Sequence, residues 1–278
     1  MKIAHCQFES WCGDFAHNLQ RFEEGLVKAD AERAAIVCFP ECFLTGYPDT
    51  AEKAAAGAFP MDGPEMQRLL DVSSRYEAAA IVGFNEKRAA DLYNTAAVVH
   101  RGHLLGHYSK CAAYQKFHRQ GRHFPIFEHQ GLTFGVLICA DGGYIEPARL
   151  LALKGARAIF APHFNYIKPE GLLQHFTKVR ADHAARAIEN QIYFIRGNNV
   201  VLDHTKSGIS KVQGVGYGDS YVMGPDGQII AQSRRHQEDF LVADIEINLP
   251  ADTAWGMGKS AWSWREFAPL IEAELGKR

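Results

Sequence analysis

The sequence predicts an α/β fold in which two mixed sheets carry helices on their outer faces. Apolar runs of strand length alternate with stretches of helical period, as in α/β proteins. Strand-like runs also follow one another without an intervening helix, between residues 78 and 109 and again between residues 191 and 246. These consecutive strands argue against a simple doubly wound parallel sheet and favour two mixed sheets.

Several stretches have the period of a helix. Asp14 is expected to be the N-cap of the first, because its short polar side chain accepts a hydrogen bond from the free N–H groups of the first turn. An apolar stripe follows at Phe15, Leu19, Phe22 and Leu26. Pro64 is expected in the first turn of the next helix, where its missing N–H costs least. The predicted helices are residues 15–31, 64–77, 146–154, 171–189 and 264–275.

The strand candidates are apolar runs that end at turn residues. Gly224-Pro225-Asp226-Gly227 predicts a hairpin between the two strands that flank it. The predicted strands are residues 2–8, 35–41, 78–84, 93–100, 104–109, 132–139, 156–162, 191–198, 215–223, 228–232 and 240–246. No linker or internal repeat divides the chain. We therefore expect a single domain over residues 1–278, with a core over about residues 1–246 and a C-terminal tail at 247–278.

Composition and charge exclude several classes of partner. The 278 residues are 47% hydrophobic and 22% charged, as in ordinary globular proteins. The net charge of −2 leaves no electrostatic footprint for nucleic acid or an anionic membrane. No apolar run approaches the length of a membrane span, and the N-terminus lacks the apolar core of a secretory signal. The six cysteines match neither a zinc site nor a disulfide scaffold. We expect a cytoplasmic protein with free thiols.

Three chemically active side chains stand at the ends of predicted strands. Cys139 ends an apolar run, Glu41 ends another, and Lys110 follows a third. Each alone is ordinary, because most strand cysteines are small core residues and most Glu and Lys side chains are solvated. A thiol, a carboxylate and an ammonium together can carry out acyl transfer at a carbonyl carbon. The combination therefore predicts a catalytic site.

Five ordered segments, spread from about residue 2 to about residue 246, resemble motifs of the nitrilase superfamily, the carbon–nitrogen hydrolases. The first three resemble the glutamate, lysine and nucleophile motifs of that family. The segments are Phe39-Pro40-Glu41-Cys42-Phe43-Leu44-Thr45-Gly46-Tyr47, Tyr108-Ser109-Lys110, residues 135–141 with their continuation through Arg149, residues 186–191 and residues 218–227. Any one of them alone would be a weak signal, whereas five in this order are specific.

The resemblance implies an α-β-β-α sandwich that is completed by dimerisation, as a homodimer or a higher homo-oligomer. It implies a catalytic triad of Glu41, Lys110 and Cys139 that needs no cofactor and no metal. The implied reaction is hydrolysis of a small amide or N-carbamoyl compound through a thioester, with release of ammonia or an amine. A nitrile hydrolase or an amide acyltransferase would use the same triad. A catalytically silent binding protein with the same fold is a further alternative.

The proposed chemistry explains the residue types. A free thiol with a pKa of about 8.5 is only a few per cent ionised at neutral pH, so Cys139 needs a base. Glu41 can accept the thiol proton and return it to the leaving nitrogen. The Lys110 ammonium and the backbone N–H of Ala140 can stabilise the tetrahedral oxyanion. Lys110 is also expected to favour the thiolate.

The segment after Lys110 departs from the family pattern. Many members carry a second glutamate there, but residues 111–121 contain no acid. Depending on how the segment is aligned, Tyr114 or His118 takes that place, and either is expected to supply the missing hydrogen bond to substrate or to its surroundings.

Four further polar residues have predicted roles. His163 and Asn165 follow the apolar strand 156–162 and should open into the same cleft, so both are candidates for substrate contact. Glu189 and Asp219 are instead expected to hold neighbouring elements together.

Overall fold

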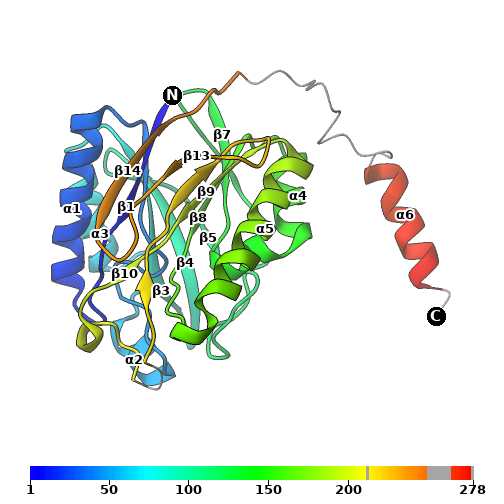
Figure 1. Cartoon of the computed structure of the whole chain (residues 1–278). Coiled ribbons are helices and arrows are strands. Elements are labelled where there is room, and N and C mark those ends of the chain that lie inside the picture. Colours follow the sequence, from blue (N-terminus) through cyan, green and yellow to red (C-terminus); the bar gives the residue numbers. More distant parts are fainter. Residues whose placement is uncertain (211–212, 249–263, 277–278) are drawn as a thin grey trace.

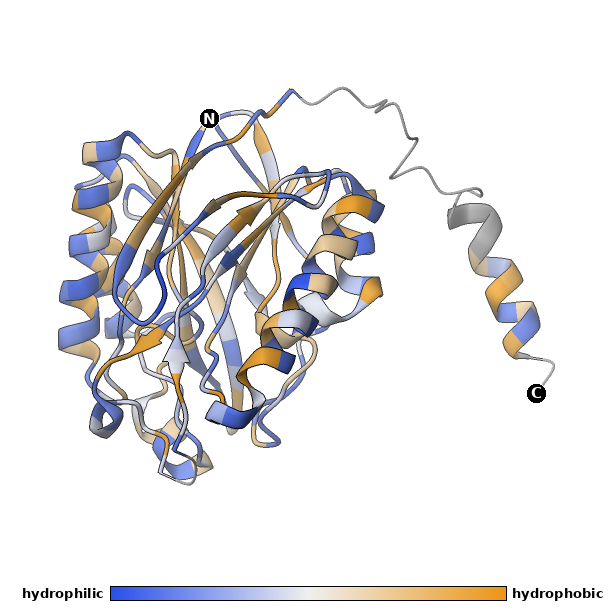
Figure 2. Ribbon diagram, viewed as in Figure 1, coloured by the Kyte–Doolittle hydropathy of each residue, from blue (hydrophilic) through white to orange (hydrophobic). Residues whose placement is uncertain are grey.

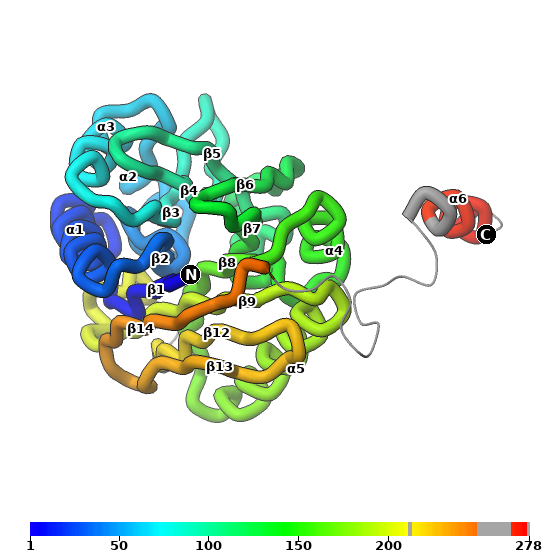
Figure 3. Tube along the Cα trace, turned by 90° about the horizontal axis from the view of Figure 1, so that it is seen from above, coloured from blue at the N-terminus to red at the C-terminus, as the bar shows by residue number. Residues whose placement is uncertain are grey.

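The structure, a computed structural model, describes residues 1–210, 213–248 and 264–276. Two six-stranded mixed sheets pack face to face, and helices cover their outer faces (Figures 1 and 3). This α-β-β-α arrangement confirms the predicted fold class. None of the helices in these ranges combines the length and the apolar composition that a membrane span requires.

The first sheet has the order β14-β1-β2-β3-β4-β5, in which β1, β2 and β3 run parallel and the outer strands antiparallel. Helices α1 and α3 cover its outer face, and α2 contacts β3 (Figure 3). The bounds are β1 Lys2–Gln7, α1 Phe15–Glu32, β2 Ile36–Cys38, α2 Ala51–Gly57, α3 Pro64–Ser73, β3 Ala79–Arg88, β4 Asp91–His100, β5 His103–Ser109 and β14 Asp239–Asp244.

The second sheet has the order β13-β12-β9-β8-β7-β6, with β7, β8 and β9 parallel. Helices α4 and α5 pack on each other, and α5 covers β9 and β12. The bounds are β6 Ile126–His129, β7 Leu132–Val136, α4 Ile145–Leu153, β8 Ala158–Pro162, α5 Leu172–Asn190, β9 Tyr193–Gly197, β12 Tyr221–Met223 and β13 Ile229–Gln232. The small pair β10 Val200–Val201 and β11 Gly216–Tyr217 lies apart from both sheets, and α6 spans Trp264–Leu275.

Alternation along the strands divides the core into two layers. On β3, Ala79 and Ile81 join the cluster between the two sheets, whereas Ala80, Val82 and Phe84 join the cluster beneath α1 and α3. Successive strand side chains point to opposite faces, so a fully apolar strand fills both layers. The strands are accordingly rich in apolar residues, and α1 places its hydrophilic residues on its outer side (Figure 2).

The first helix begins as predicted. The Asp14 carboxylate accepts a hydrogen bond from the His17 N–H at 3.0 Å, which makes Asp14 the N-cap of α1. Leu19, Phe22 and Leu26 are buried against the first sheet. The stripe of apolar residues therefore positions α1 on the outer face of that sheet.

Three predicted strands are shorter in the structure, and each ends for a local reason. The strand predicted at 35–41 ends at Cys38, because Pro40 has no N–H to pair. The strand predicted at 132–139 ends at Val136, before the 3₁₀-helix Cys139–Gly143. The strand predicted at 215–223 is split into β11 and β12 by Gly218 and Asp219, which both have positive φ.

Some elements of the structure were absent from the prediction, and one predicted boundary is not tested. Helix α2 and strand β6 were not predicted, since the Ala-rich α2 lacks an apolar stripe and β6 has only four residues. The single domain and its boundary near residue 246 stay predictions, because residues 249–263 lie outside the described part of the chain.

Gly83 of β3 allows the turn that carries Glu41 to approach the sheet. A Cβ at this position would lie 2.5 Å from the Cys42 backbone N and 3.2 Å from the Glu41 carbonyl carbon. We expect Gly83→Ala to displace that turn and to lower the unfolding free energy by about 1–3 kcal/mol. The melting temperature should fall by several degrees, which thermal unfolding followed by circular dichroism measures.

Gly57→Ala is the matched control, because a Cβ there would meet no atom closer than 3.8 Å. Equal melting temperatures for the two variants would contradict the role given to Gly83.

Candidate active site

Glu41 lies buried in the turn after β2, where three hydrogen-bond donors hold its carboxylate. Its Oε1 accepts from the Lys110 Nζ at 2.6 Å and from the Asn94 Nδ2 at 2.7 Å. Its Oε2 accepts from the backbone N–H of Phe164 at 2.9 Å. A buried charge is tolerated only with close partners, and these three donors supply them.

Lys110 is buried directly after β5, where neighbouring backbone fixes its position. Its N–H donates to the Asn94 carbonyl at 2.9 Å, and its carbonyl accepts from Gly121 at 2.8 Å. Burial on its own lowers the pKa of Lys110, but the negative charges of Glu41 and of an ionised Cys139 raise its net pKa well above the ordinary value. The side chain therefore stays an ammonium beside the carboxylate.

Cys139 begins the 3₁₀-helix Cys139–Gly143 with φ +49°, in the left-handed region that a side chain rarely adopts. The chain therefore turns sharply at the end of the apolar run that the sequence showed. Burial is the main cause that raises the pKa of its thiol to about 12, and the charge of Glu41 and a hydrogen bond with Glu41 act in the same direction. Lys110 and the Phe164 N–H oppose this shift without reversing it.

Lys110 favours the thiolate of Cys139, as expected, because its charge lowers the pKa of the thiol, but burial outweighs this effect. Much of the charge of Lys110 is neutralised by Glu41 at 2.6 Å. The thiol is neutral at physiological pH and needs a base at the moment of attack. Glu41 is the carboxylate whose charge acts on this thiol.

Asp141 joins the lysine segment to the cysteine turn. Its Oδ2 accepts from the Tyr108 hydroxyl at 2.7 Å and from the Ile138 N–H at 2.9 Å. Its Oδ1 accepts from the Ala112 N–H at 2.7 Å and from the Cys111 thiol at 3.2 Å. One fully buried carboxylate thus sets the position of Cys139 relative to Lys110.

His163 and Asn165 follow β8, as predicted, and both are buried. The His163 ring donates through Nδ1 to the Ala161 carbonyl at 2.7 Å, and its pKa lies well below the usual value because of burial and the charge of Arg196. Its carbonyl accepts from the Glu41 N–H at 3.2 Å, which ties β8 to the glutamate turn. Asn165 reaches the site with its side chain, whose Nδ2 donates to the Cys139 sulfur at 3.6 Å.

Tyr114 and His118 have different surroundings. The Tyr114 side chain is 77% exposed and lines a cavity of about 480 Å³ together with Ala140. His118 is buried, and its Nε2 is bonded to the Asn85 Oδ1 at 2.8 Å. Burial, followed by the charge of Lys110, lowers the pKa of His118 to about 4. His118 is thus the one of the two that lies within electrostatic reach of Lys110.

Sequence reasoning missed Asn94 and gave no role to Asp141. Asn94 is a buried amide in the apolar strand β4, and a polar residue in such a run is itself a signal of a specific partner. The expectation for Asp219 is met, because it pairs with Arg180 of α5 and with Arg235 after β13 at 2.8 Å each. The ion pair of Glu189 is with Arg186 at 2.8 Å, inside the same helix α5, so it joins no neighbouring element.

Within the described ranges, no group of three or more His, Cys, Asp or Glu side chains is arranged to hold a metal ion.

Comparison with known proteins gives a consistent assignment. The model of the carbon-nitrogen hydrolase family matches residues 2–254. A protein of Pseudomonas protegens described as "Hydrolase in pqqF 5'region" is 33% identical over 83% of this chain and 78% of its own length. An (R)-stereoselective amidase of a Pseudomonas species is 30% identical over 72% of this chain and 71% of its own. A crystal structure of an amidase from Nesterenkonia has a TM-score of 0.72 and 23% identity, over 88% of this chain and 90% of that one.

The four hydrogen bonds that Asp141 accepts predict how much this residue contributes to the unfolding free energy. Asp141→Asn replaces one acceptor oxygen by an NH₂ group that faces two N–H, O–H or S–H donors. We expect the unfolding free energy to fall by about 2–4 kcal/mol, because a buried hydrogen-bonded network loses its charge and two of its bonds. Chemical denaturation measures the loss.

Asp226→Asn is the control, since the Asp226 side chain is exposed in a turn and bonds the Gln228 N–H. A loss at Asp141 no larger than at Asp226 would show that Asp141 does not hold the cysteine turn.

Proposed function

Because the chain belongs to the carbon-nitrogen hydrolase family, we propose that it hydrolyses a small amide or N-carbamoyl compound through a thioester on Cys139. The proposal depends mainly on one observation: the Glu41 carboxylate bonds the Lys110 ammonium at 2.6 Å, and the charges of both groups act on the thiol of Cys139. The similarity to an (R)-stereoselective amidase supports an amide as the substrate.

The first half-reaction forms the thioester. Glu41 takes the proton of the Cys139 thiol as the sulfur attacks the carbonyl carbon, and the C=O π electrons move to oxygen. The Lys110 ammonium and the Ala140 N–H stabilise this oxyanion. Ala140 lies in the first turn of the 3₁₀-helix Cys139–Gly143, where N–H groups have no partner within the helix. Glu41 then gives its proton to the nitrogen, the C–N bond breaks, and ammonia or an amine leaves.

The second half-reaction regenerates the thiol. Glu41, now a carboxylate again, accepts a proton from water as the water oxygen attacks the thioester carbon. The same two donors stabilise the second tetrahedral intermediate. Its C–S bond breaks, the acid product leaves, and the sulfur regains its proton from Glu41. Lys110 stays protonated throughout, consistent with its strongly raised pKa.

A cavity lies next to the residue that follows Cys139. The cavity beside Ala140 has a volume of about 480 Å³, and Cys111, Tyr114 and Tyr144 are among the residues that line it. Contacts from Tyr114, His118, His163 and Asn165 to the substrate remain predictions.

We also propose that the chain forms a homodimer or a higher homo-oligomer through the α4–α5 face. Ile145, Leu150 and Leu153 of α4 and Leu173 of α5 are 41–80% exposed. Apolar residues that gather on one face often mark a protein interface. The expected location in the cytoplasm rests on the six cysteines, all of which are free thiols in the structure.

The catalytic proposal predicts the effects of three substitutions on ammonia release from small amides, N-carbamoyl compounds and nitriles. Cys139→Ala should abolish release, since no nucleophile is left. Glu41→Gln should lower kcat by about 10²–10⁴ through loss of the base. Lys110→Met should lower kcat by about 10²–10³ through loss of an oxyanion donor.

Cys12→Ala is the control, because Cys12 is a half-buried thiol outside this cluster, and it should keep the parent rate. Equal release by the parent and Cys139→Ala would defeat the mechanism.

The interface proposal predicts that Leu153→Glu dissociates the oligomer into monomers, because it places a charge on the apolar face of α4. Light scattering after size-exclusion chromatography measures the mass. Val27→Glu on α1 is the matched control and should leave the mass unchanged, since Val27 is 51% exposed and α1 lies on the opposite side of the molecule from α4 and α5 (Figure 1). A parent that is monomeric at micromolar concentration would refute the proposal.

A further inference from the structure

Arg196 of β9 is a fully buried cation with no carboxylate partner among the described residues. Its Nη1 donates to the carbonyls of Gly218, at 3.1 Å, and of Asp219. Its Nη2 donates to the Asn165 Oδ1 at 2.5 Å and to the Tyr217 hydroxyl at 2.9 Å. Burial of an arginine without a counter-ion is costly, and its Nε has no hydrogen-bond partner, so the four acceptors around Nη1 and Nη2 require an explanation.

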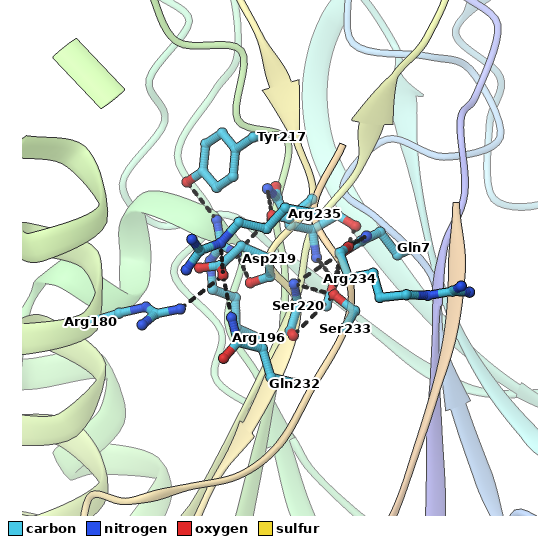
Figure 4. Close-up of polar contacts among 12 residues, drawn as sticks. Gln7, Arg180, Arg196, Tyr217, Asp219, Ser220, Gln232, Ser233, Arg234 and Arg235 are labelled. Carbon is cyan, nitrogen blue, oxygen red and sulfur yellow. Dashed lines mark hydrogen bonds and ion pairs between the residues drawn. The ribbon is translucent and has the colours of Figure 1, made fainter. Parts of the chain in front are cut away.

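A clamp around Asp219 holds the two carbonyls in place (Figure 4). The Asp219 Oδ1 accepts from Arg180, Arg235 and Gln232, at 2.6–2.8 Å. Gly218 and Asp219 both have positive φ, and this turn presents their carbonyls to the guanidinium of Arg196. The Asp219 carboxylate thus stabilises the turn, whereas the Nη2 of Arg196 donates to Asn165.

These contacts determine how the amide of Asn165 is oriented. Its Oδ1 faces two donors, the Arg196 Nη2 at 2.5 Å and the Tyr217 hydroxyl at 3.4 Å. The reverse orientation would place an NH₂ group against a guanidinium that has no acceptor. The Nδ2 must therefore point the other way, where it donates to the Cys139 sulfur at 3.6 Å. The backbone of Asn165 is fixed as well, since its N–H donates to the side-chain oxygens of Asn198 and Asn199.

We propose that Asn165 is a catalytic hydrogen-bond donor to the Cys139 sulfur, and that Arg196 is the positioning residue that orients it. The inference rests on the proposed function. The Asn165 N–H bond to sulfur strengthens as negative charge develops there, when the thiol proton moves to Glu41 and again when the thioester C–S bond breaks. No atom is transferred by Asn165 or Arg196 in either step.

The competing explanation is that Arg196 only fastens β9 to the turn at Gly218 and Asp219. Both explanations predict that its loss impairs the protein. They differ in one respect: a positioning residue acts through Asn165, so its effect should vanish once Asn165 has lost its amide. A double-mutant cycle measures this coupling.

The cycle combines Asn165→Ala with Arg196→Lys, which keeps the positive charge but loses the planar fork. We expect Asn165→Ala to lower kcat by about 100-fold with a smaller change in KM, as for loss of one transition-state donor. Arg196→Lys should lower kcat by about tenfold, and the double variant should match Asn165→Ala within about threefold. A double variant whose loss is the product of the two single losses would overturn the proposal.

Tyr217→Phe tests the same contacts to the Asn165 Oδ1, and it removes only one hydroxyl from the buried network. It removes one of the two donors to the Asn165 Oδ1, and should lower kcat by about threefold only while Asn165 is present. Arg186→Gln is the matched control, because Arg186 is a buried arginine that pairs with Glu189 inside α5 and belongs neither to the Asp219 clamp nor to the contacts of Asn165, and it should keep the parent kcat. A loss with Arg186→Gln as large as with Arg196→Lys would support the purely structural explanation.

A substrate-free measurement separates this inference from the proposed function. The same variants are alkylated with iodoacetamide at pH 8, and the rate at Cys139 is followed by peptide mass mapping. Loss of a donor to sulfur lowers the thiolate fraction, so the rate should fall in Asn165→Ala and in Arg196→Lys, and no further in the double variant. If the parent released ammonia from no amide, the proposed function would fail, and this second cycle would still decide the role of Arg196.

Discussion

The buried ion pair between Glu41 and Lys110 is the interaction on which the rest of the site depends. Removing two charges from water costs several kcal/mol per ion, and their mutual attraction offsets this only when the remaining hydrogen-bonding positions are filled. Here Asn94 and the Phe164 N–H fill them, so β4 and the segment after β8 must be in place before the pair is stable. The contact therefore couples the two sheets as well as two catalytic groups.

The same pair sets the protonation of the nucleophile. An isolated lysine would favour a thiolate, but a lysine already paired with a carboxylate leaves burial as the dominant effect, and the pKa of Cys139 rises to about 12. The sulfur is then neutral until a carbonyl group approaches. One carboxylate can serve both half-reactions because it gives up each proton that it has accepted, and Lys110 keeps its own.

The sequence predicted features that follow from the order of residues along the chain. It did not predict features that depend on contacts between residues far apart in the chain. Strand ends located Glu41, Lys110 and Cys139, because apolar runs mark strands, although β2 and β5 belong to the first sheet and the run that ends at Cys139 belongs to the second. The protonation of Cys139 could not be inferred, since its burial and its contact with Glu41 arise only after folding. Arg196 reads as one charge in an apolar strand, and only the fold shows that its acceptors come from two separate segments, residues 217–219 and Asn165.

The missing acid in residues 111–121 is consistent with this charge arrangement. Glu41 and Lys110 cancel each other and Asp141 already acts on Lys110, so a carboxylate in residues 111–121 would add further negative charge near the place where the oxyanion has to form. His118 is buried within reach of Lys110, and its pKa of about 4 keeps it neutral at physiological pH. A neutral imidazole held by Asn85 fills that space without opposing the oxyanion. The departure from the family pattern thus removes a negative charge from the surroundings of Lys110 and leaves the charges of the ion pair unchanged.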